Sequence, residues 1–345
     1  MSEMIPHDRA ISRWLILCLA MIFAMVILGG VTRLTGSGLS MVHWKPVSGI
    51  FPPLNSEQWQ EEFGFYQESP EFQKINRDMG VDAFKSIFWL EYTHRMLGRA
   101  VGLVFLLPFL YFWWRNWIKP GLTPKLLVMF VLGGLQGLLG WYMVKSGLVD
   151  NPNVSQYRLT AHLLSAILIY GFILWVILDL RNQQSYLPFS NSQLRRWRIG
   201  SLGLATLLLI TITSGGFVAG LKAGLIFNTF PLMDGRWVPE GLAALSPWYL
   251  NLFENSVTVQ FDHRLLAITT ALLLLIWYLK GRAMPQSTAI RRSFKLIGMG
   301  VIIQVTLGVG TLLMQVPVWL VVMHQAGALL LFSVMLANVH ALSRY

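Results

Sequence analysis

The sequence has little charge and almost no cysteine for its length. Only 12% of its 345 residues are Asp, Glu, Lys or Arg, which is about half the share found in an average soluble domain. The single cysteine, Cys18, lies within an apolar run. A disulfide framework, a Cys-x-x-Cys motif and a thiolate metal site are therefore excluded within one chain. We interpret Cys18 as a small buried apolar side chain.

Two kinds of targeting segment are also missing. The first 14 residues are mostly polar, and the apolar run that follows has no small-residue cleavage signature. We therefore interpret this run as a retained helix and not as a signal peptide. An Arg- and Ser-rich, acid-poor presequence of the mitochondrial type is not apparent either.

Apolar residues dominate what is present. They make up 54% of the chain and include 14 Trp and 20 Phe. The net charge of +11 is typical of some nucleic-acid-binding proteins, but the basic residues do not form one stripe. They cluster between the apolar runs, as topology signals of membrane proteins do. We predict a protein embedded in membrane lipid, with no nucleic-acid partner.

Eight apolar runs are long enough to cross a bilayer, which takes about 20 residues of α-helix. The Val316-Pro317 turn joins the last two of them. The fold class predicted is an all-α polytopic membrane protein with eight transmembrane helices. The runs cover residues 14–31, 87–113, 126–145, 159–180, 199–219, 257–279, 296–315 and 318–342.

The distribution of Lys and Arg predicts the orientation. Fifteen of these residues lie in short segments on one side of the predicted membrane. Nine lie on the other side, in longer segments that also hold most of the acidic residues, chiefly the loops 32–86 and 220–256. The positive-inside rule places both termini in the cytoplasm and the two long loops outside. We expect a multi-pass protein of a bacterial inner membrane.

An internal repeat divides the chain into two halves. Four pairs of segments match in the same order: LGGVTRLTGSGL (28–39) with SGGFVAGLKAGL (214–225), EYTHR (91–95) with QFDHR (260–264), LQGLLG (135–140) with IQVTLG (303–308), and AHLLSA (161–166) with MHQAGA (323–328). The copies are four spans apart, so both halves have the same orientation in the membrane. We predict two tandem pseudo-symmetric four-helix bundles, residues 1–190 and 191–345.

Four histidines lie within about two turns of the outer ends of the even-numbered helices. They are His94, His162, His263 and His324, two from each half. No cysteine or pair of carboxylates accompanies them, which argues against zinc and di-iron centres. Two imidazoles facing each other inside an apolar bundle suit the axial positions of a haem iron. The alternative for each single histidine is a hydrogen-bonded core residue.

Small and basic residues near these histidines have two interpretations each. Glycines near the sites would let a flat macrocycle approach the backbone, or they serve ordinary helix packing. They are Gly98, Gly102, Gly133, Gly134, Gly137, Gly140, Gly308, Gly310 and Gly327. Arg95 and Arg264 directly follow a histidine. They are placed to pair with haem propionates, or to extend toward the membrane interface.

The two halves differ at one acidic position. Glu91 precedes His94 by three residues and shares its helical face, whereas the equivalent residue in the second half is Gln260. A carboxylate beside a haem can accept protons, orient water or stabilise a developing cation. The asymmetry suggests that one haem is acted upon while the other is kept. A purely structural, neutral Glu91 is the alternative.

Segments spread over most of the chain resemble the haem A synthase family. The long first loop and the lack of a cysteine pair are similar to its mitochondrial and alphaproteobacterial branch. The resemblance rests on GGVTRLTGSGLSMVHWKPVSGIFPPLN (29–55), EYTHRMLGR (91–99), GLQGLLGWYMVKSGL (134–148), YRLTAHL (157–163), GGFVAGLKAGLIFNTFPLMDGRWVP (215–239), NLFEN (251–255), QFDHR (260–264) and VMHQAGA (322–328).

This resemblance implies an enzyme that oxidises the C8 methyl of haem O to a formyl group, through successive hydroxylations and dehydration of a geminal diol. It implies that His263 and His324 ligate a resident haem b in the C-terminal half. His94 and His162 would flank the iron of the substrate haem O in the N-terminal half, with Glu91 as the catalytic carboxylate. A haem O synthase and an electron-transfer partner are expected. Homo-oligomerisation is left open.

Two other classes of function were weighed. A dihaem b-type membrane cytochrome that only transfers electrons would also need four paired histidines. It has no evident need for a carboxylate on one side only, so the Glu91 and Gln260 difference favours the enzyme. A transporter would fit the parallel repeat, but the sequence contains no broken helix or charge cluster at mid-membrane depth.

Overall fold

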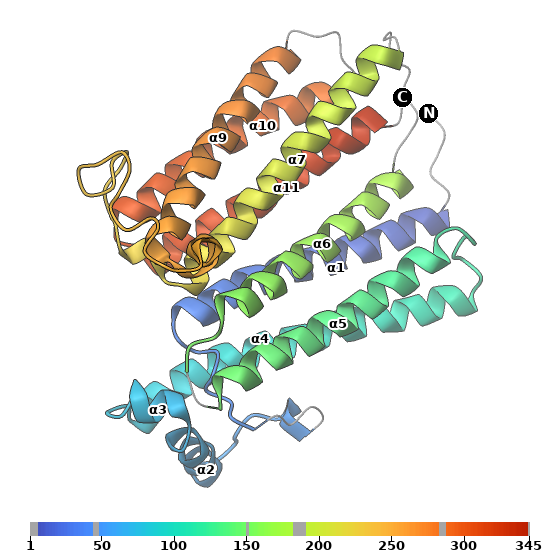
Figure 1. The fold of residues 1–345 in the computed structure, drawn as a ribbon. Helices are drawn as coiled ribbons and strands as arrows, with labels where there is room; N and C mark the ends of the chain where they lie inside the picture. The colour runs from blue at the N-terminus through green and yellow to red at the C-terminus, as the bar shows by residue number, and fades with distance from the viewer. Residues whose placement is uncertain (1–5, 44–47, 150–151, 182–190, 283–287, 344–345) are drawn as a thin grey trace. The chain divides into compact units, whose positions relative to one another are not determined.

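The computed structural model describes residues 6–43, 48–149, 152–181, 191–282 and 288–343. Within these residues, eight helices are long and apolar enough to cross a membrane, and each coincides with one of the predicted runs. The prediction of eight spans is therefore confirmed (Figure 1). The helices are α1 (Pro6–Leu34), α4 (Val81–Trp114), α5 (Thr123–Gly147), α6 (Gln156–Arg181), α7 (Asn191–Gly220), α9 (Ser256–Arg282), α10 (Thr288–Leu313) and α11 (Val318–Ser343).

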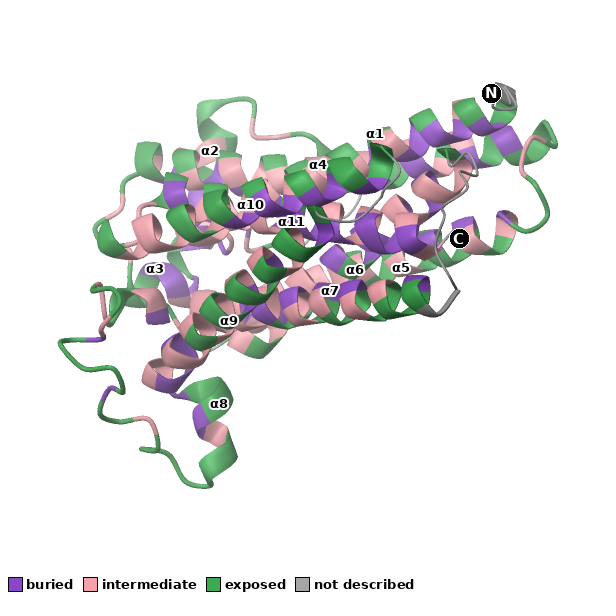
Figure 2. Ribbon diagram, turned by 90° about the horizontal axis from the view of Figure 1, so that it is seen from above, coloured by how far each residue is buried: buried purple, intermediate pink, exposed green. Residues whose placement is uncertain are grey.

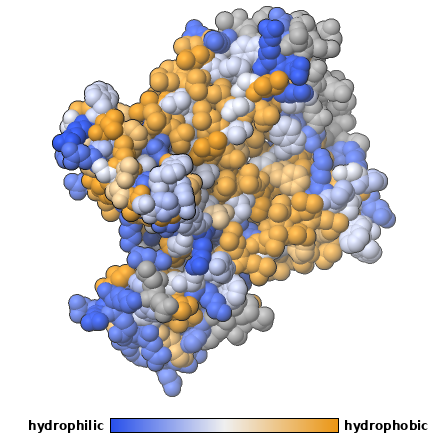
Figure 3. All heavy atoms as spheres, in the orientation of Figure 1, coloured by the Kyte–Doolittle hydropathy of each residue, from blue (hydrophilic) through white to orange (hydrophobic). Residues whose placement is uncertain are grey.

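Large apolar side chains are exposed along the spanning helices. Leu107 of α4, Leu138 of α5 and Ile302 of α10 are each more than 60% exposed. Exposed residues follow the helices as well as the loops (Figure 2), and hydrophobic residues cover much of the helical surface (Figure 3). Soluble proteins rarely expose an apolar surface of this extent to water, so we infer that it contacts lipid. The chain is a multi-pass membrane protein.

Most of the helices extend beyond the predicted apolar runs, and two of their ends bear on the site and its loops. The helix α4 begins at Val81 and not at residue 87, because a polar segment continues the helix beyond the apolar run. The helix α10 ends at Leu313 and not at residue 315. Gln315 and Val316 have φ angles of 61° and 62°, a left-handed conformation that cannot continue an α-helix.

The chain divides into two compact units. One contains residues 17–169 and is called the N-terminal unit; the other contains residues 1–16 and 170–345 and is called the C-terminal unit. The helices α1 and α6 each contribute one part to either unit. The division of the repeat at residue 190 stays a prediction.

In the C-terminal unit, four helices pack in a closed ring. The helix α7 contacts α9 and α11, and α10 contacts the same two helices. Buried polar groups join them at one end: Ser201 Oγ donates to Asn338 Oδ1 (2.7 Å), and Asn338 Nδ2 donates to Ser293 Oγ (2.9 Å). Three helices are tied together by side chains that no water reaches, which favours one fixed arrangement of the bundle.

The loop between α7 and α9 contains three short helices, η2 (Ala223–Leu225), η3 (Trp248–Leu250) and α8 (Asn251–Glu254). Its fold depends on Asn251, the first residue of the NLFEN segment, which is 4% exposed. The Asn251 side chain accepts from Leu245 N–H (3.0 Å) and donates to the carbonyls of Leu245 (2.8 Å) and Trp248 (2.9 Å). The described residues include one isolated β-bridge, Met233 with Arg236, and no strand.

In the N-terminal unit, α4 packs against α5 and against a helix that the sequence analysis did not predict. This helix, α2 (Ser56–Gln67), lies in the first loop together with α3 (Pro70–Lys74) and the 3₁₀ turn η1 (Ser48–Ile50). Asn55 caps α2 by accepting a hydrogen bond from Gln58 N–H (2.9 Å), and Ser69 caps α3 in the same way.

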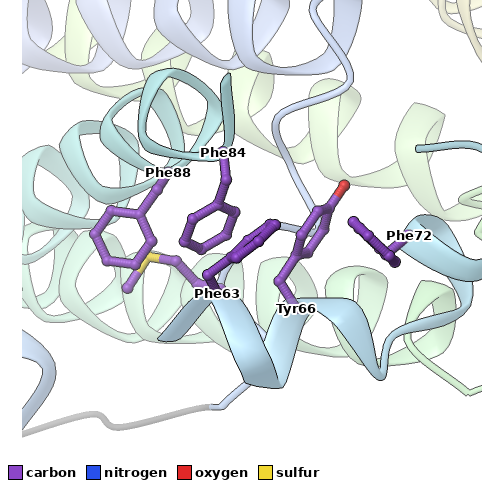
Figure 4. Close-up of a cluster of buried hydrophobic side chains, with 6 residues drawn as sticks. Phe63, Tyr66, Phe72, Phe84 and Phe88 are labelled. Carbon is purple, nitrogen blue, oxygen red and sulfur yellow. The ribbon is translucent and has the colours of Figure 1, made fainter. Parts of the chain in front are cut away.

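An aromatic cluster fastens α2 and α3 to the start of α4. Its residues are buried, and the rings of Tyr66 and Phe84 stack with centroids 5.1 Å apart (Figure 4). Burial raises the pKa of the Tyr66 phenol, which donates a hydrogen bond to Glu71 (3.1 Å). The first loop therefore covers the end of α4. The cluster consists of Met41, Phe63, Tyr66, Phe72, Phe84 and Phe88.

Candidate functional site

Each unit of the structure contains two of the four histidines, on two different helices. His94 on α4 and His162 on α6 are close enough for their charges to interact, within the N-terminal unit. His263 on α9 and His324 on α11 interact in the same way within the C-terminal unit. All four imidazoles are half-buried. Each pair comes from two different helices, so each could hold one group between them.

Every one of the four imidazoles packs against a glycine of a neighbouring helix. A Cβ added at Gly140 would lie 2.9 Å from His162 Cε1, and one added at Gly308 would lie 2.8 Å from His324 Cε1. The other two rings rest on α1 and α7 through the two remaining glycines. A Cβ would lie 3.2 Å from His94 Nε2 at Gly29, and 3.2 Å from His263 Cε1 at Gly215. Larger residues would displace the rings, so these glycines determine where the imidazoles lie.

Gly29 and Gly215 were not among the glycines predicted to lie near the sites. The repeat contained the signal, because LGG (28–30) aligns with SGG (214–216). Gly133, Gly134 and Gly137 were also predicted to be near the sites. A Cβ at any of them would meet nothing within 4 Å, so their role stays a prediction.

Matching glutamines hold the second histidine of each pair. Gln136 Nε2 donates to the carbonyl oxygen of His162 (2.8 Å) and lies 3.1 Å from its Nδ1. Gln304 Nε2 makes the same contacts with His324, at 2.9 and 3.1 Å. An amide nitrogen can only donate, so each glutamine donates to Nδ1 of its histidine and holds the ring on that side.

His263 is held as an axial ligand needs to be. Ser214 Oγ lies 2.7 Å from the carbonyl oxygen of Thr211 and 2.8 Å from His263 Nδ1. Because a carbonyl can only accept, the hydroxyl hydrogen goes to Thr211, and Ser214 accepts from the Nδ1–H of His263. The lone pair on Nε2 is then available to a metal. A haem iron therefore fits this donor set, with the porphyrin supplying its other four ligands.

His94 differs from the other three histidines. Its Nε2 is the atom nearest to Gly29, and the described residues provide no hydrogen bond to its ring. Leu28 stands where the second half has Ser214. His94 also lies more than three turns into its helix, because α4 starts earlier than predicted. The other three lie within about two turns of their helix starts.

Glu91 is buried in a network that connects α4 to the first loop. Only 2% of it is exposed. One carboxylate oxygen forms an ion pair with Arg95, and the other accepts from Ser40 Oγ (2.7 Å) and Met41 N–H (2.9 Å). Arg95 also donates to the Met41 carbonyl (3.0 Å). Sequence reasoning missed Ser40 and Met41, since nothing in a periodic pattern places a loop 50 residues away against a helix.

Gln260 and Arg264 make the equivalent contacts in the C-terminal unit. Gln260 Nε2 donates to the Phe227 carbonyl (2.9 Å). The two terminal nitrogens of Arg264 donate to the carbonyls of Phe227 and Thr229, both at 2.8 Å. Among the described residues no carboxylate pairs with Arg264, and its buried Nε and Gln260 Oε1 have no hydrogen-bond partner.

These features define a class: a membrane protein of eight spanning helices with two paired-histidine sites suited to haem. Within the described residues, no group of three or more His, Cys, Asp or Glu side chains forms a metal site without such a macrocycle. The chain belongs to the cytochrome oxidase assembly protein family COX15-CtaA, whose model matches residues 12–336.

Curated relatives carry one function in their names. "Heme A synthase" from Nitrosospira multiformis is 52% identical over 337 residues, which cover 98% of this chain and 94% of the relative. "Heme A synthase" from Paramagnetospirillum magneticum is 48% identical, covering 97% and 94%. "Heme A synthase COX15" from Homo sapiens is 46% identical, covering 94% and 81%. The resemblance stated from the motifs is confirmed.

Proposed function

We propose that this protein is a haem A synthase, an oxidoreductase that converts the C8 methyl of haem O to a formyl group. The observation that carries the proposal is that a member of this family contains two sites, each formed by two histidines that pack against glycines. Relatives named for this activity span nearly the whole chain. Nothing in the comparisons supports a cytochrome that only transfers electrons.

In this proposal the C-terminal unit holds a resident haem b between His263 and His324. The Nδ1–H of His263 is fixed by Ser214, and His324 is tethered by Gln304. Bound haem supplies one-electron chemistry at its iron. The protein orients both imidazoles, and the tightly packed ring of helices excludes water from them.

The N-terminal unit binds the substrate haem O between His94 and His162. Glu91 is the carboxylate of this site. Three donors, Arg95 among them, hold it in place, so it is a fixed carboxylate at the site where the methyl group is oxidised. Arg95 and Arg264 fasten the two long loops over the helix ends and are placed to meet the propionates of the two haems.

The cellular setting follows from the predicted topology. The protein lies in the bacterial inner membrane with both termini in the cytoplasm, so both haem sites lie toward the outer side. A haem O synthase supplies the substrate, and an electron-transfer partner takes up the electrons that leave the methyl group. Both partners are expected from the chemistry, since haem O must be made and its oxidation needs an acceptor.

Extraction of haem from cells that express the protein together with a haem O source tests the function. We expect haem A in the extract, identified by chromatography and mass. The proposal would be contradicted if the protein is folded and loaded with haem but its extract contains only haem b and haem O. That result would favour a cytochrome that only transfers electrons.

Replacing Gly308 with Ala tests the resident haem site. The new Cβ would lie 2.8 Å from His324 Cε1 and push the imidazole out of position. Since even outer partners of metal ligands contribute 10–100-fold to affinity, we expect Gly308→Ala to bind this haem at least about 10-fold more weakly. The measurement is haem content per chain with the low-spin absorption spectrum.

Gly310→Ala is the matched control. It lies on the same helix, and its Cβ would meet only Leu320 Cδ1, at 3.9 Å. Both variants gain the same helix propensity, so only the contact with His324 distinguishes them. Equal haem content in the two variants would show that Gly308 does not position a ligand.

A further inference from the structure

The two units use the same device to fasten a loop to a helix. In both, an arginine directly after a histidine donates to carbonyl oxygens of the preceding loop: Arg95 to Met41, and Arg264 to Phe227 and Thr229. In both, the side chain four residues before the arginine bonds to the same loop. The mechanical role is therefore shared, and a difference between the units has to be sought elsewhere.

The units differ in the net charge of these two side chains. Glu91 forms an ion pair with Arg95, and the two charges cancel. Gln260 is neutral, and no described carboxylate pairs with Arg264. One unit therefore presents a neutral pair beside its histidines, whereas the other presents an uncompensated guanidinium. A guanidinium that no described carboxylate neutralises is available to bind an anion.

One buried donor indicates where that anion binds. The Nε of Arg264 keeps its hydrogen without an acceptor among the described residues, since both terminal nitrogens are used by the loop. The neighbouring residue, His263, is the histidine whose Nε2 is prepared for a metal. A carboxylate attached to the macrocycle that His263 binds would satisfy both the charge and the Nε–H. A haem carries such carboxylates as its propionates.

We propose that the difference between Glu91 and Gln260 determines which haem the protein retains and which it exchanges. Gln260 leaves Arg264 charged, so the C-terminal site binds haem propionate strongly and keeps its cofactor. Glu91 neutralises Arg95, so the N-terminal site binds propionate weakly and releases its haem after each turnover. This inference rests on the proposed function for the identity of the haems.

The histidines show the same asymmetry independently. Ser214 holds His263 by its Nδ1, whereas Leu28 stands at the matching position and no described residue bonds to the His94 ring. The Nε2 of His94 is the ring atom nearest to Gly29, whereas at the other three histidines the atom nearest to the glycine is Cε1. The N-terminal site therefore has one ligand prepared less firmly than its counterpart, as suits a haem that must leave.

The test adds a charge to the retaining site. Gln260→Glu neutralises Arg264 and loses the hydrogen bond to Phe227; Gln260→Met loses the same hydrogen bond without adding charge. Purified full-length protein, expressed without a haem O source, is mixed with apomyoglobin, and haem transfer is followed by absorbance. We expect Gln260→Glu to lose its haem at least about 10-fold faster than Gln260→Met, the value of one charge-assisted hydrogen bond.

The reciprocal variant tests the exchanging site. Glu91→Gln frees the charge of Arg95 while keeping an acceptor for Ser40 and Met41. Expressed with a haem O source, it should release haem O to apomyoglobin about 10-fold more slowly than the wild type. Equal transfer rates for Gln260→Glu and Gln260→Met, or an unchanged release rate of haem O from Glu91→Gln, would overturn the inference.

These readouts separate the inference from the proposed function. Retention of the resident haem is measured in protein that never meets haem O, so it does not depend on turnover. A protein that makes no haem A but shows the expected difference between Gln260→Glu and Gln260→Met would refute the synthase activity and support the charge effect. Normal haem A formation with equal haem transfer from Gln260→Glu and Gln260→Met would support the synthase activity and refute the charge effect.

Discussion

Replacing Glu91 with Gln should nearly abolish haem A formation while the protein stays folded and keeps its resident haem. The amide can still accept from Ser40 and Met41, so the first loop stays attached to α4. What is lost is the negative charge that pairs with Arg95. Removal of a catalytic carboxylate typically slows a reaction by 10²–10⁴, and we expect a loss of roughly 100-fold in haem A per chain.

The measurement is the ratio of haem A to haem O in extracts of cells expressing each variant. Glu71→Gln is the matched control, because Glu71 is also a buried carboxylate, 6% exposed, but bonds to Tyr66 in the aromatic cluster. We expect it to form haem A normally. A wild-type yield from Glu91→Gln would show that Glu91 only holds the loop.

The spanning helices and the pairing of the histidines could be predicted because both leave periodic or repeated signals. A helix that crosses lipid has to satisfy its own backbone and face lipid on its outside, so it appears as a long apolar run. The duplication did the rest: EYTHR and QFDHR are similar enough to place His94 and His263 in equivalent positions. Neither inference needed the distance between any two atoms.

The contacts of Glu91 could not be predicted, because they depend on the path of a loop. Ser40 and Met41 belong to an irregular segment, and no rule of spacing brings their hydroxyl and amide to a residue 50 positions later. The same holds for the cluster around Phe84. The helices α2 and α3 were not predicted either, because they are short and mostly polar and apolar periodicity does not reveal them.

The glycines show a third kind of limit. Small residues in membrane helices pack against many partners, so a glycine near a histidine has no particular meaning in sequence alone. Gly29 and Gly140 touch imidazoles, whereas Gly133 and Gly137 touch nothing within 4 Å. Only the direction of each side chain around its helix separates the two groups, and that direction depends on how the helices rotate against one another.

Replacing His263 with Ala should remove the resident haem, whereas His94→Ala should not. His263 is the histidine whose Nδ1–H is fixed by Ser214, and it lies in the closely packed ring of α7, α9, α10 and α11. Loss of an axial ligand costs more than loss of an outer partner, so we expect at least about a 100-fold fall in affinity for this haem. The measurement is haem per chain in protein expressed without a haem O source.

The comparison between the two variants assigns the halves. His94→Ala removes an imidazole that no described residue tethers, so it should retain the low-spin spectrum of the resident haem and lose only haem A formation. His263→Ser is a further control, because serine keeps a polar side chain at this position of the helix but offers the iron no imidazole. If His94→Ala loses the resident haem and His263→Ala keeps it, the assignment is reversed: the N-terminal unit then holds the cofactor, and the substrate binds beside Arg264.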